Sequence, residues 1–196
     1  GPEKIRIIKR FFDFDFRIPR IIERKVNASS VLENVPELES YLNFLKSKGQ
    51  HEKLILGSAW VSDLTIFDNY TAAKWTELLS GGDLHLLVVP HNLNPDFVLK
   101  LQTRLQSIFP TLPLYEISKT NGAFNSDVLQ SNPGIVVLNM SGILCELFSQ
   151  FHFAYIGGGY ERSIHSVLEP FFSGLQVAIG PKIHRSTEYD YIAEIL

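Results

Sequence analysis

The chain has 196 residues, of which 45% are hydrophobic and 20% are charged, and its formal net charge is −3. This balance is typical of a folded globular chain and excludes an intrinsically disordered one. A net negative charge gives no electrostatic basis for binding nucleic acid, so we expect no nucleic-acid partner. The length favours one domain with a connecting arm over two full domains.

The single cysteine, Cys145, excludes an intrachain disulfide framework and fits a reducing compartment. It lies in the apolar run 143–145, which predicts a buried, inert thiol rather than a nucleophile. No apolar run approaches the length of a bilayer span, and no signal peptide is visible. The chain begins Gly1-Pro2 without Met, so we expect the natural protein to extend upstream.

The first part of the chain is interpreted as a connecting arm. Aromatic and charged residues alternate over 11–17, in a segment too short for a separate domain. Helical spacing follows at Leu38, Tyr41, Leu42 and Leu45, and Gly49 is a plausible end for that helix. We therefore expect residues 1–50 to form an arm and a helix that pack on the rest of the chain.

From residue 51 to residue 196, apolar strands and helices alternate. Strands are predicted at 54–57, 84–89, 112–117, 135–138, 153–156 and 177–179. Helices are predicted at 66–79, 97–109, 142–150, 165–172 and 188–196. Continuous apolar strands that alternate with helices indicate an α/β domain with a Rossmann-like, doubly wound parallel sheet.

Four of the predicted strands end in loops that could bind a ligand. These loops are Gly57-Ser58, Pro90-His91, 139–142 and 157–159. Ligands of such sheets bind beyond the carboxyl ends of the strands, where these loops meet. Their convergence predicts a binding site at that edge.

The segment AYIGGGYERSIHSVLEP, residues 154–170, is the strongest motif. Its three glycines would let a ligand approach the backbone, and the amides of the following helix suit a phosphate. Glu169 could accept hydrogen bonds from a ribose diol. The alternative is a tight structural turn followed by a surface glutamate. The motif fits neither the dinucleotide fingerprint nor the P-loop, which argues against NAD and ATP.

This segment resembles the Kdo (3-deoxy-D-manno-octulosonic acid) transferase family, whose C-terminal domains carry a glycine-rich turn and an L-E-P or L-E-A helix. VVLNMSGILCELF at 136–148, GPKIHRSTE at 180–188, GSAW at 57–60 and DFRIPRI at 15–21 resemble further family segments in the same order. The matches span residues 15–188. The family's P-R-H is Pro90-His91-Asn92 here, and its G-S-T-W threonine is Ala59.

The resemblance implies the C-terminal domain of a GT-B glycosyltransferase, in which residues 51–196 bind a CMP-sugar. The expected reaction moves Kdo from CMP-Kdo to a lipid A precursor in lipopolysaccharide biosynthesis, at the cytoplasmic face of the bacterial inner membrane. The family's N-terminal half holds the acceptor and the catalytic base, so the base is unknown here and membrane association is expected only through the full-length protein. We therefore expect the chain alone to be inactive.

The residues that we expect to bind the donor are Ser58, Pro90, His91, Met140, Ser141, Gly142, Gly158, Gly159, Arg162, His165, Ser166, Val167, Leu168 and Glu169. His91 and His165 would donate to a phosphate or carboxylate, and Arg162 would supply a cation. The backbone of 165–168 would meet the phosphate, and Met140 with its neighbours the cytosine. The alternatives are a solvated loop histidine, a surface arginine, and helix caps at Ser141 or Asn139.

No cofactor or metal is expected, because the six histidines lack metal-ligand spacing and no Asp-x-Asp motif is present. His152 is interpreted as structural, and His184 and Arg185 as a solvated loop. Two rival functions stay open. One is a nucleotide-binding module without catalysis, and the other is a GT-B enzyme that uses UDP-sugars, such as an epimerase or a GlcNAc transferase.

Overall fold

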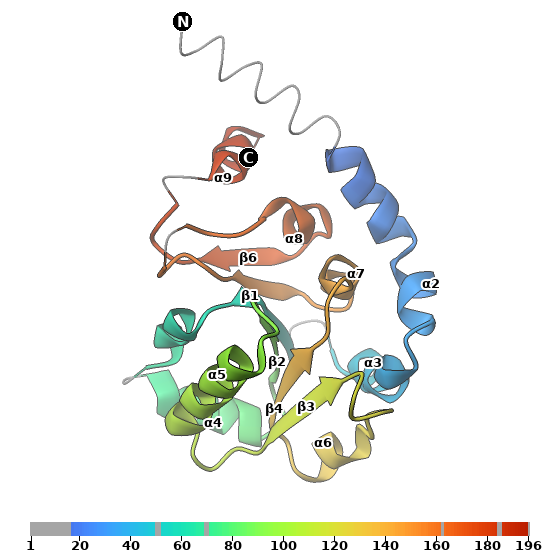
Figure 1. Cartoon of the computed structure of the whole chain (residues 1–196), viewed down its shortest axis with the longest axis vertical. Coiled ribbons are helices and arrows are strands. Elements are labelled where there is room, and N and C mark those ends of the chain that lie inside the picture. Colours follow the sequence, from blue (N-terminus) through green and yellow to red (C-terminus); the bar gives the residue numbers. More distant parts are fainter. Residues whose placement is uncertain (1–16, 50–51, 69–70, 162, 184–185, 196) are drawn as a thin grey trace, which may run out of the picture.

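The computed structural model describes residues 17–49, 52–68, 71–161, 163–183 and 186–195 (Figure 1). Its centre is a six-stranded sheet in the order β3-β4-β2-β1-β5-β6, and every neighbouring pair is parallel. The strands are β1 (Lys53–Ala59), β2 (His85–Pro90), β3 (Leu114–Ser118), β4 (Ile135–Asn139), β5 (Phe153–Ile156) and β6 (Gln176–Ile179). The predicted parallel α/β sheet is confirmed.

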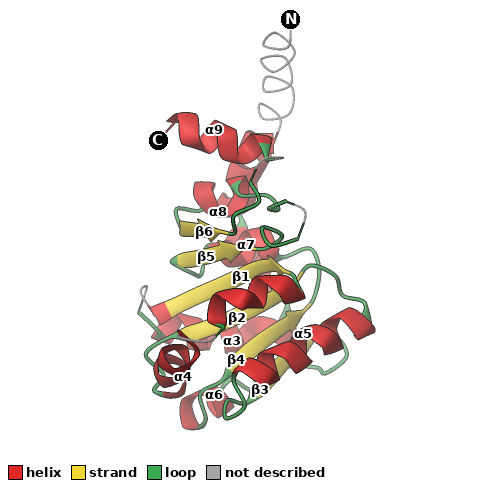
Figure 2. Ribbon diagram, turned by 90° about the vertical axis from the view of Figure 1, so that its left-hand side faces the viewer, coloured by secondary structure: helices red, strands yellow, loops and turns green. Residues whose placement is uncertain are grey.

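Helices cover both faces of this sheet (Figure 2). They are α2 (Ala28–Glu33), η1 (Pro36–Leu38), α3 (Glu39–Ser47), η3 (Val61–Phe67), α4 (Ala72–Ser80), α5 (Pro95–Ile108), α6 (Asp127–Ser131), α7 (Leu144–Phe148), α8 (Leu168–Phe172) and α9 (Thr187–Ile195). Successive strand residues point to opposite faces, so Ile55 packs with α3 and α7 while Leu56 packs with η3, α4 and α5. The domain is therefore doubly wound.

Three predicted helices differ from the observed ones. The helix expected at 66–79 is two elements, η3 and α4, because Asp68 adopts an extended backbone (ψ 150°) that ends η3. The helix expected from 142 begins at Leu144, since Gly142 has a positive φ of 87°. The helix expected from 165 begins at Leu168, which puts Pro170 in its first turn, where a missing N–H costs nothing. The sequence did not predict α2 or α6.

The strand order places a switch point beside β1. The chain leaves β1 toward β2 on one side, whereas the connection through α7 leads to β5 on the other side of β1. The connections that leave the carboxyl ends of β1 and β5 therefore run to opposite sides of the sheet. A switch point of this kind is where open α/β sheets bind ligands.

Residues 17–49, the described part of the predicted arm, pack against the sheet domain. Tyr41 and Leu45 of α3 are fully buried in the same core as Ile55. Further upstream, residues 17–26 are helical and run past α7 and α8 (Figure 1). Arg24 of this helix donates two hydrogen bonds of 2.7 Å to the carboxylate of Glu146 in α7. These bonds fasten the helix at 17–26 to α7, which follows β4.

Candidate functional site

Three aromatic rings meet at the carboxyl edge of the sheet, and we call them the ring cluster. Trp60 follows β1, His91 follows β2, and His165 follows the glycine turn after β5. The ring planes of Trp60 and His165 are parallel within 1°, and the indole Nε1–H donates to Nε2 of His165 at 2.9 Å. The His91 ring stacks over both, with centroid distances of 4.3 and 4.2 Å. Two of the predicted site residues are thus brought together.

Both imidazoles of the ring cluster are neutral at neutral pH. Burial lowers the pKa of His91, and the negative charge of Asp63 opposes this only in part. Burial also lowers the pKa of His165, where the neighbouring His91 adds to the effect and Asp63 opposes it. The cluster therefore offers uncharged N–H donors and acceptors rather than cations.

Asp63 joins the loop after β1 to the glycine turn, and the sequence did not predict it as a site residue. It is fully buried. Its Oδ2 accepts hydrogen bonds from the backbone N–H groups of Trp60 at 2.9 Å and Gly158 at 2.8 Å. Its Oδ1 accepts from the Tyr155 hydroxyl at 3.3 Å. The available signal was its spacing, because an acidic residue three positions after the N-cap, here Trp60, suits a local N–H acceptor.

The glycines of the turn are required by close approaches within the protein itself. A Cβ on Gly157 would lie 2.2 Å from the carbonyl oxygen of Ser58, and one on Gly159 would lie 2.5 Å from Cα of Gly180. Gly158 has a φ of 96°, which suits only glycine. Sequence reasoning expected this space to serve a ligand, but the chain's own backbone fills it. The glycines therefore let the backbone of the turn pack closely against Ser58 and Gly180.

The N-terminus of α8 already has an anionic partner. Glu188 of α9 accepts hydrogen bonds from the backbone N–H groups of Val167 at 2.9 Å and Leu168 at 3.4 Å. The same carboxylate forms an ion pair with Arg17, whose guanidinium donates to the Ser166 hydroxyl at 3.2 Å. The amides that were expected to meet a phosphate are therefore occupied by Glu188 in this structure. Neither Glu188 nor Arg17 was predicted as a site residue.

Glu169 lies in a charged cluster on the same side of the domain as this contact. The group is half-buried, and burial raises its pKa, whereas the positive charges of Arg24 and Arg17 lower it. Glu188 and Glu146 raise it further. The cluster also includes the carbonyl of Gly142, which accepts from Arg24 at 3.1 Å. Gly142 and Glu169, predicted from separate motifs, thus share a neighbour.

The remaining predicted residues of the loops after β1, β2 and β4 fall into different environments. Met140 is 5% exposed and packs in the core, so only its backbone could face a base. Ser141 is exposed and does not cap α7, whose N-cap is Ile143 without a side-chain hydrogen bond. Pro90 is buried at the end of β2, and Ser58 has a positive φ of 54°.

Asn139 does not cap a helix either, because its amide donates to Glu116 at 3.1 Å. Arg162, His184 and Arg185 lie outside the described residues, so the predictions for them stay predictions. His152 lies next to Gln176 of β6, 3.4 Å from its amide nitrogen, in keeping with a structural role. Cys145 is buried, which confirms the prediction for this thiol.

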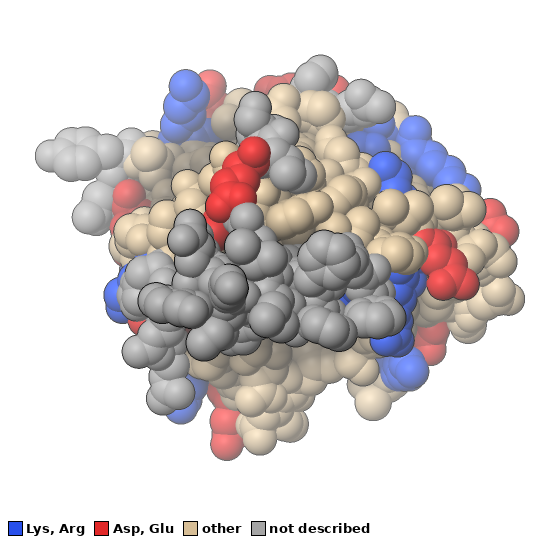
Figure 3. All heavy atoms as spheres, turned by 90° about the horizontal axis from the view of Figure 1, so that it is seen from above, with Lys and Arg blue, Asp and Glu red and all other residues tan. Residues whose placement is uncertain are grey.

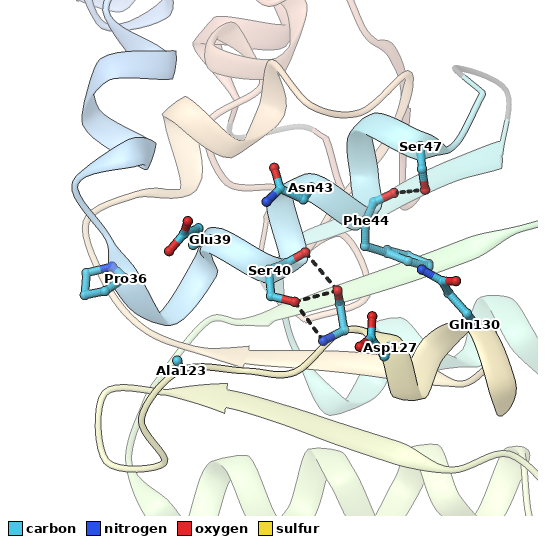
Figure 4. Close-up of a pocket in the computed structure, with 10 residues that line it drawn as sticks. Pro36, Glu39, Ser40, Asn43, Phe44, Ser47, Ala123, Asp127 and Gln130 are labelled. Carbon is cyan, nitrogen blue, oxygen red and sulfur yellow. Dashed lines mark hydrogen bonds between the residues drawn. The ribbon is translucent and has the colours of Figure 1, made fainter.

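A hollow of about 400 Å³ between α3 and α6 holds none of the predicted residues (Figure 4). The hydroxyls of Ser40 and Ser126 bond to each other across it at 2.7 Å, and the backbone N–H of Ser126 donates to Ser40 Oγ at 3.0 Å. These bonds fasten the start of α6 to α3. We therefore assign this hollow a structural role.

Charges of both signs are mixed on the end of the molecule that carries α8 and α9 (Figure 3). Within the described residues, no group of three His, Cys, Asp or Glu side chains could hold a metal ion. None of the helices in this part of the chain is long and apolar enough to cross a membrane.

Comparison with known proteins gives one informative likeness. No protein-family model and no curated protein matches the sequence. Among solved structures, the chain is similar to the C-terminal CMP-Kdo binding domain of WaaA from Acinetobacter baumannii, with a TM-score of 0.56 and 14% identity over 89% of this chain and 76% of that one. At this identity the likeness establishes the fold alone. The chain therefore has a Rossmann-like, doubly wound fold similar to that of this domain, as its sequence pattern predicted.

Proposed function

We propose that this chain is the donor-binding part of a glycosyltransferase that uses CMP-Kdo, with residues 51–196 as the binding domain and residues 1–50 as a connecting arm. The observation that carries the proposal is the shared fold with a domain described as binding CMP-Kdo. The family-like segments at 57–60, 136–148 and 154–170 support it, because all three reach the carboxyl edge of the sheet. In such folds that edge is where a nucleotide binds.

The donor is an anion, with a phosphate on its nucleotide and a carboxylate on its sugar. His91 and His165 supply neutral N–H donors to one of these groups, and Glu169 accepts hydrogen bonds from the ribose diol. The cytosine lies against the backbone of 140–142. Preorganised donors of this kind stabilise the charge that develops on CMP as it leaves, without a metal ion. Binding of the phosphate to the amides of Val167 and Leu168 requires Glu188 to give them up.

The acceptor and the catalytic base belong to the other half of the enzyme in this proposal. The acceptor is a lipid A precursor, and the full-length protein works at the cytoplasmic face of the bacterial inner membrane. The isolated chain then binds the donor but transfers no sugar. Kdo transfer to a lipid A precursor by the chain alone would show that these roles are assigned wrongly.

Thermal unfolding with CMP and with UDP tests the nucleotide. A ligand that binds the native state raises the melting temperature by mass action, so CMP raises it and UDP leaves it unchanged. A response to UDP would instead favour an enzyme that uses UDP-sugars. CMP binding without turnover, once an N-terminal half is supplied, would favour a module without catalysis.

Calorimetry on Glu169→Gln tests the site. Hydrogen bonds to a charged group contribute about 1.5–3 kcal/mol, so CMP affinity falls about tenfold or more while the melting temperature changes little. Glu161→Gln is the matched control, because Glu161 is exposed in the same turn region. Equal CMP affinity in both variants would remove Glu169 from the site, and loss of folding would make it structural.

A further inference from the structure

We propose that Trp60 is a positioning residue that holds His165 as the neutral tautomer with its proton on Nδ1, so that the ring presents one uncharged N–H donor to an anionic group of the ligand. Trp60 was not among the residues expected to bind the donor. Its role toward a ligand rests on the proposed function, whereas the tautomer of His165 follows from the geometry of the ligand-free protein.

The tautomer follows from the chemistry of the two rings. An indole N–H can only donate a hydrogen bond, so the nitrogen that it meets must carry a free lone pair. That nitrogen is Nε2 of His165, 2.9 Å from Nε1 of Trp60. The two ring planes are parallel within 1°, and the indole N–H and the imidazole lone pair each lie in the plane of their own ring. The proton of the neutral ring must then be on Nδ1.

Contacts with three neighbouring residues fix the position of the Trp60 indole. The backbone N–H of Trp60 donates to the buried Asp63, and its ring has the edge of Phe97 against it at 87° and 5.7 Å. The ring of His91 covers it at 4.3 Å. Trp60 therefore has little freedom to turn its N–H elsewhere.

His165 is anchored to the same frame. Its backbone N–H donates to the carbonyl of Gly157 at 3.0 Å, and the next glycine, Gly158, donates to Asp63. Asp63 thus contacts Trp60 directly and also contacts the glycine turn to which the backbone of His165 is bonded. Among the described residues, no hydrogen bond reaches Nδ1 of His165, and the residue is partly exposed. Nδ1 is the ring nitrogen left to contact a ligand.

Burial keeps His165 neutral, and the neighbouring His91 adds to the effect. The titratable groups that face its ring are His91, from the loop after β2, and Asp63, from η3. Protonation would remove the lone pair that accepts from Trp60 and would place a cation against His91. Burial and His91 lower the pKa of His165, and Asp63 opposes them without reversing the direction. The ring therefore stays a neutral donor through the physiological range of pH.

Nitrogen NMR of the imidazoles in the ligand-free protein tests the tautomer, because protonated and unprotonated ring nitrogens have well-separated shifts. In the native protein, Nδ1 of His165 is protonated and Nε2 is not. Trp60→Phe keeps an aromatic ring against His91 and removes the N–H, so the Nε2-protonated form becomes populated and the pKa of His165 rises. Trp75→Phe is the matched control, because Trp75 packs on Phe67 in the α4 region and leaves His165 unchanged. A native His165 protonated at Nε2, or an unchanged tautomer in Trp60→Phe, would overturn the inference.

Calorimetry with CMP then tests the consequence for binding. Trp60→Phe weakens CMP binding about three- to tenfold, the size of one neutral hydrogen bond, while Trp75→Phe binds like the native protein. Equal binding by both variants would overturn the role of Trp60 toward the ligand. If the native protein itself fails to bind CMP, the proposed function fails, and the NMR result still decides the tautomer.

Discussion

Replacing Asp63 by alanine tests whether its carboxylate links the loop after β1 to the glycine turn after β5. Its carboxylate is fully buried and accepts two backbone hydrogen bonds, one from the loop after β1 and one from the glycine turn after β5. In Asp63→Ala the N–H groups of Trp60 and Gly158 lose their acceptor in a place that water reaches poorly. The link that this carboxylate makes between the two loops is then lost, whereas the Trp60–His165 bond and the bond from the Gly157 N–H to the Gly57 carbonyl remain.

The expected loss of stability follows from these two bonds. A buried donor without a partner costs about 1–3 kcal/mol, so two of them lower the free energy of unfolding by about 2–6 kcal/mol. Asp63→Asn keeps one carbonyl oxygen as the acceptor for the two backbone N–H groups, but it loses the charge and replaces the oxygen that accepts from Tyr155 by an NH2 group, so it costs about 1–2 kcal/mol. Asp68→Ala is the control. Asp68 pairs with Arg104 at 2.6 Å where both side chains are partly exposed, and such pairs contribute about 1 kcal/mol or less.

Urea unfolding of the three variants and the native protein measures these differences, with the midpoint shifting while the dependence on urea stays constant. Hydrogen exchange of the Gly158 amide gives a local readout, since in Asp63→Ala this amide loses its protection. If Asp63→Ala costs no more than Asp68→Ala, or if the Gly158 amide stays protected, the carboxylate does not hold the two loops. Other contacts would then hold the two loops in place.

Other parts of the structure yield further expected outcomes. Arg24→Ala leaves the carboxylate of Glu146, which is 5% exposed, without its partner. Because the Arg24 side chain is itself 34% exposed, we expect the free energy of unfolding, measured by chemical denaturation, to fall by about 1–3 kcal/mol. A smaller fall than that of Glu146→Gln would contradict this. Burial, with help from two lysines, lowers the pKa of His85 to about 3 from 6.5. The unfolded chain therefore binds more protons between these values, and stability falls as the pH falls through this window, by about 2 kcal/mol near pH 5. Melting temperatures measured against pH check this, and His85→Gln removes that slope. Burial raises the pKa of the Cys145 thiol to about 11, so a disulfide reagent at mildly alkaline pH modifies it no faster than the protein unfolds, and rapid labelling of the native state would refute its burial.

The sheet was predictable from the sequence because its signals are local. Runs such as 135–138 and 153–156 are apolar, short and bounded by glycine, proline or polar residues, and a strand buried on both faces leaves that trace in the sequence. The alternation with helices then implies parallel strands whose carboxyl ends share an edge. The four loops that we expected at this edge do follow the carboxyl ends of parallel strands, and two residues from them, His91 and His165, meet in the ring cluster.

The first residue of a helix could not be predicted where the sequence allows more than one backbone conformation at a single residue. Pro170 permitted a helix start at several nearby positions, and the structure selects Leu168. Gly142 allowed a start before or after it, and its positive φ selects the later one. In both cases packing of the loop on its neighbours decides between alternatives of similar local free energy.

The contacts within the site were decided by tertiary structure alone. The bond from Trp60 to His165 spans 105 positions, the ion pair of Arg17 with Glu188 spans 171, and Asp63 reaches a glycine 95 positions away. Hydrophobic periodicity carries no information on such pairs, because it reports which face of an element is buried and not which element lies opposite. The sequence by itself determined the strands, their parallel arrangement and the edge that carries the loops. Only the folded chain determined that Glu188 binds the amides at the start of α8, and that two histidines and a tryptophan meet at the carboxyl edge of the sheet. Each of these contacts depends on the strand order and on the packing of segments that are distant in the sequence.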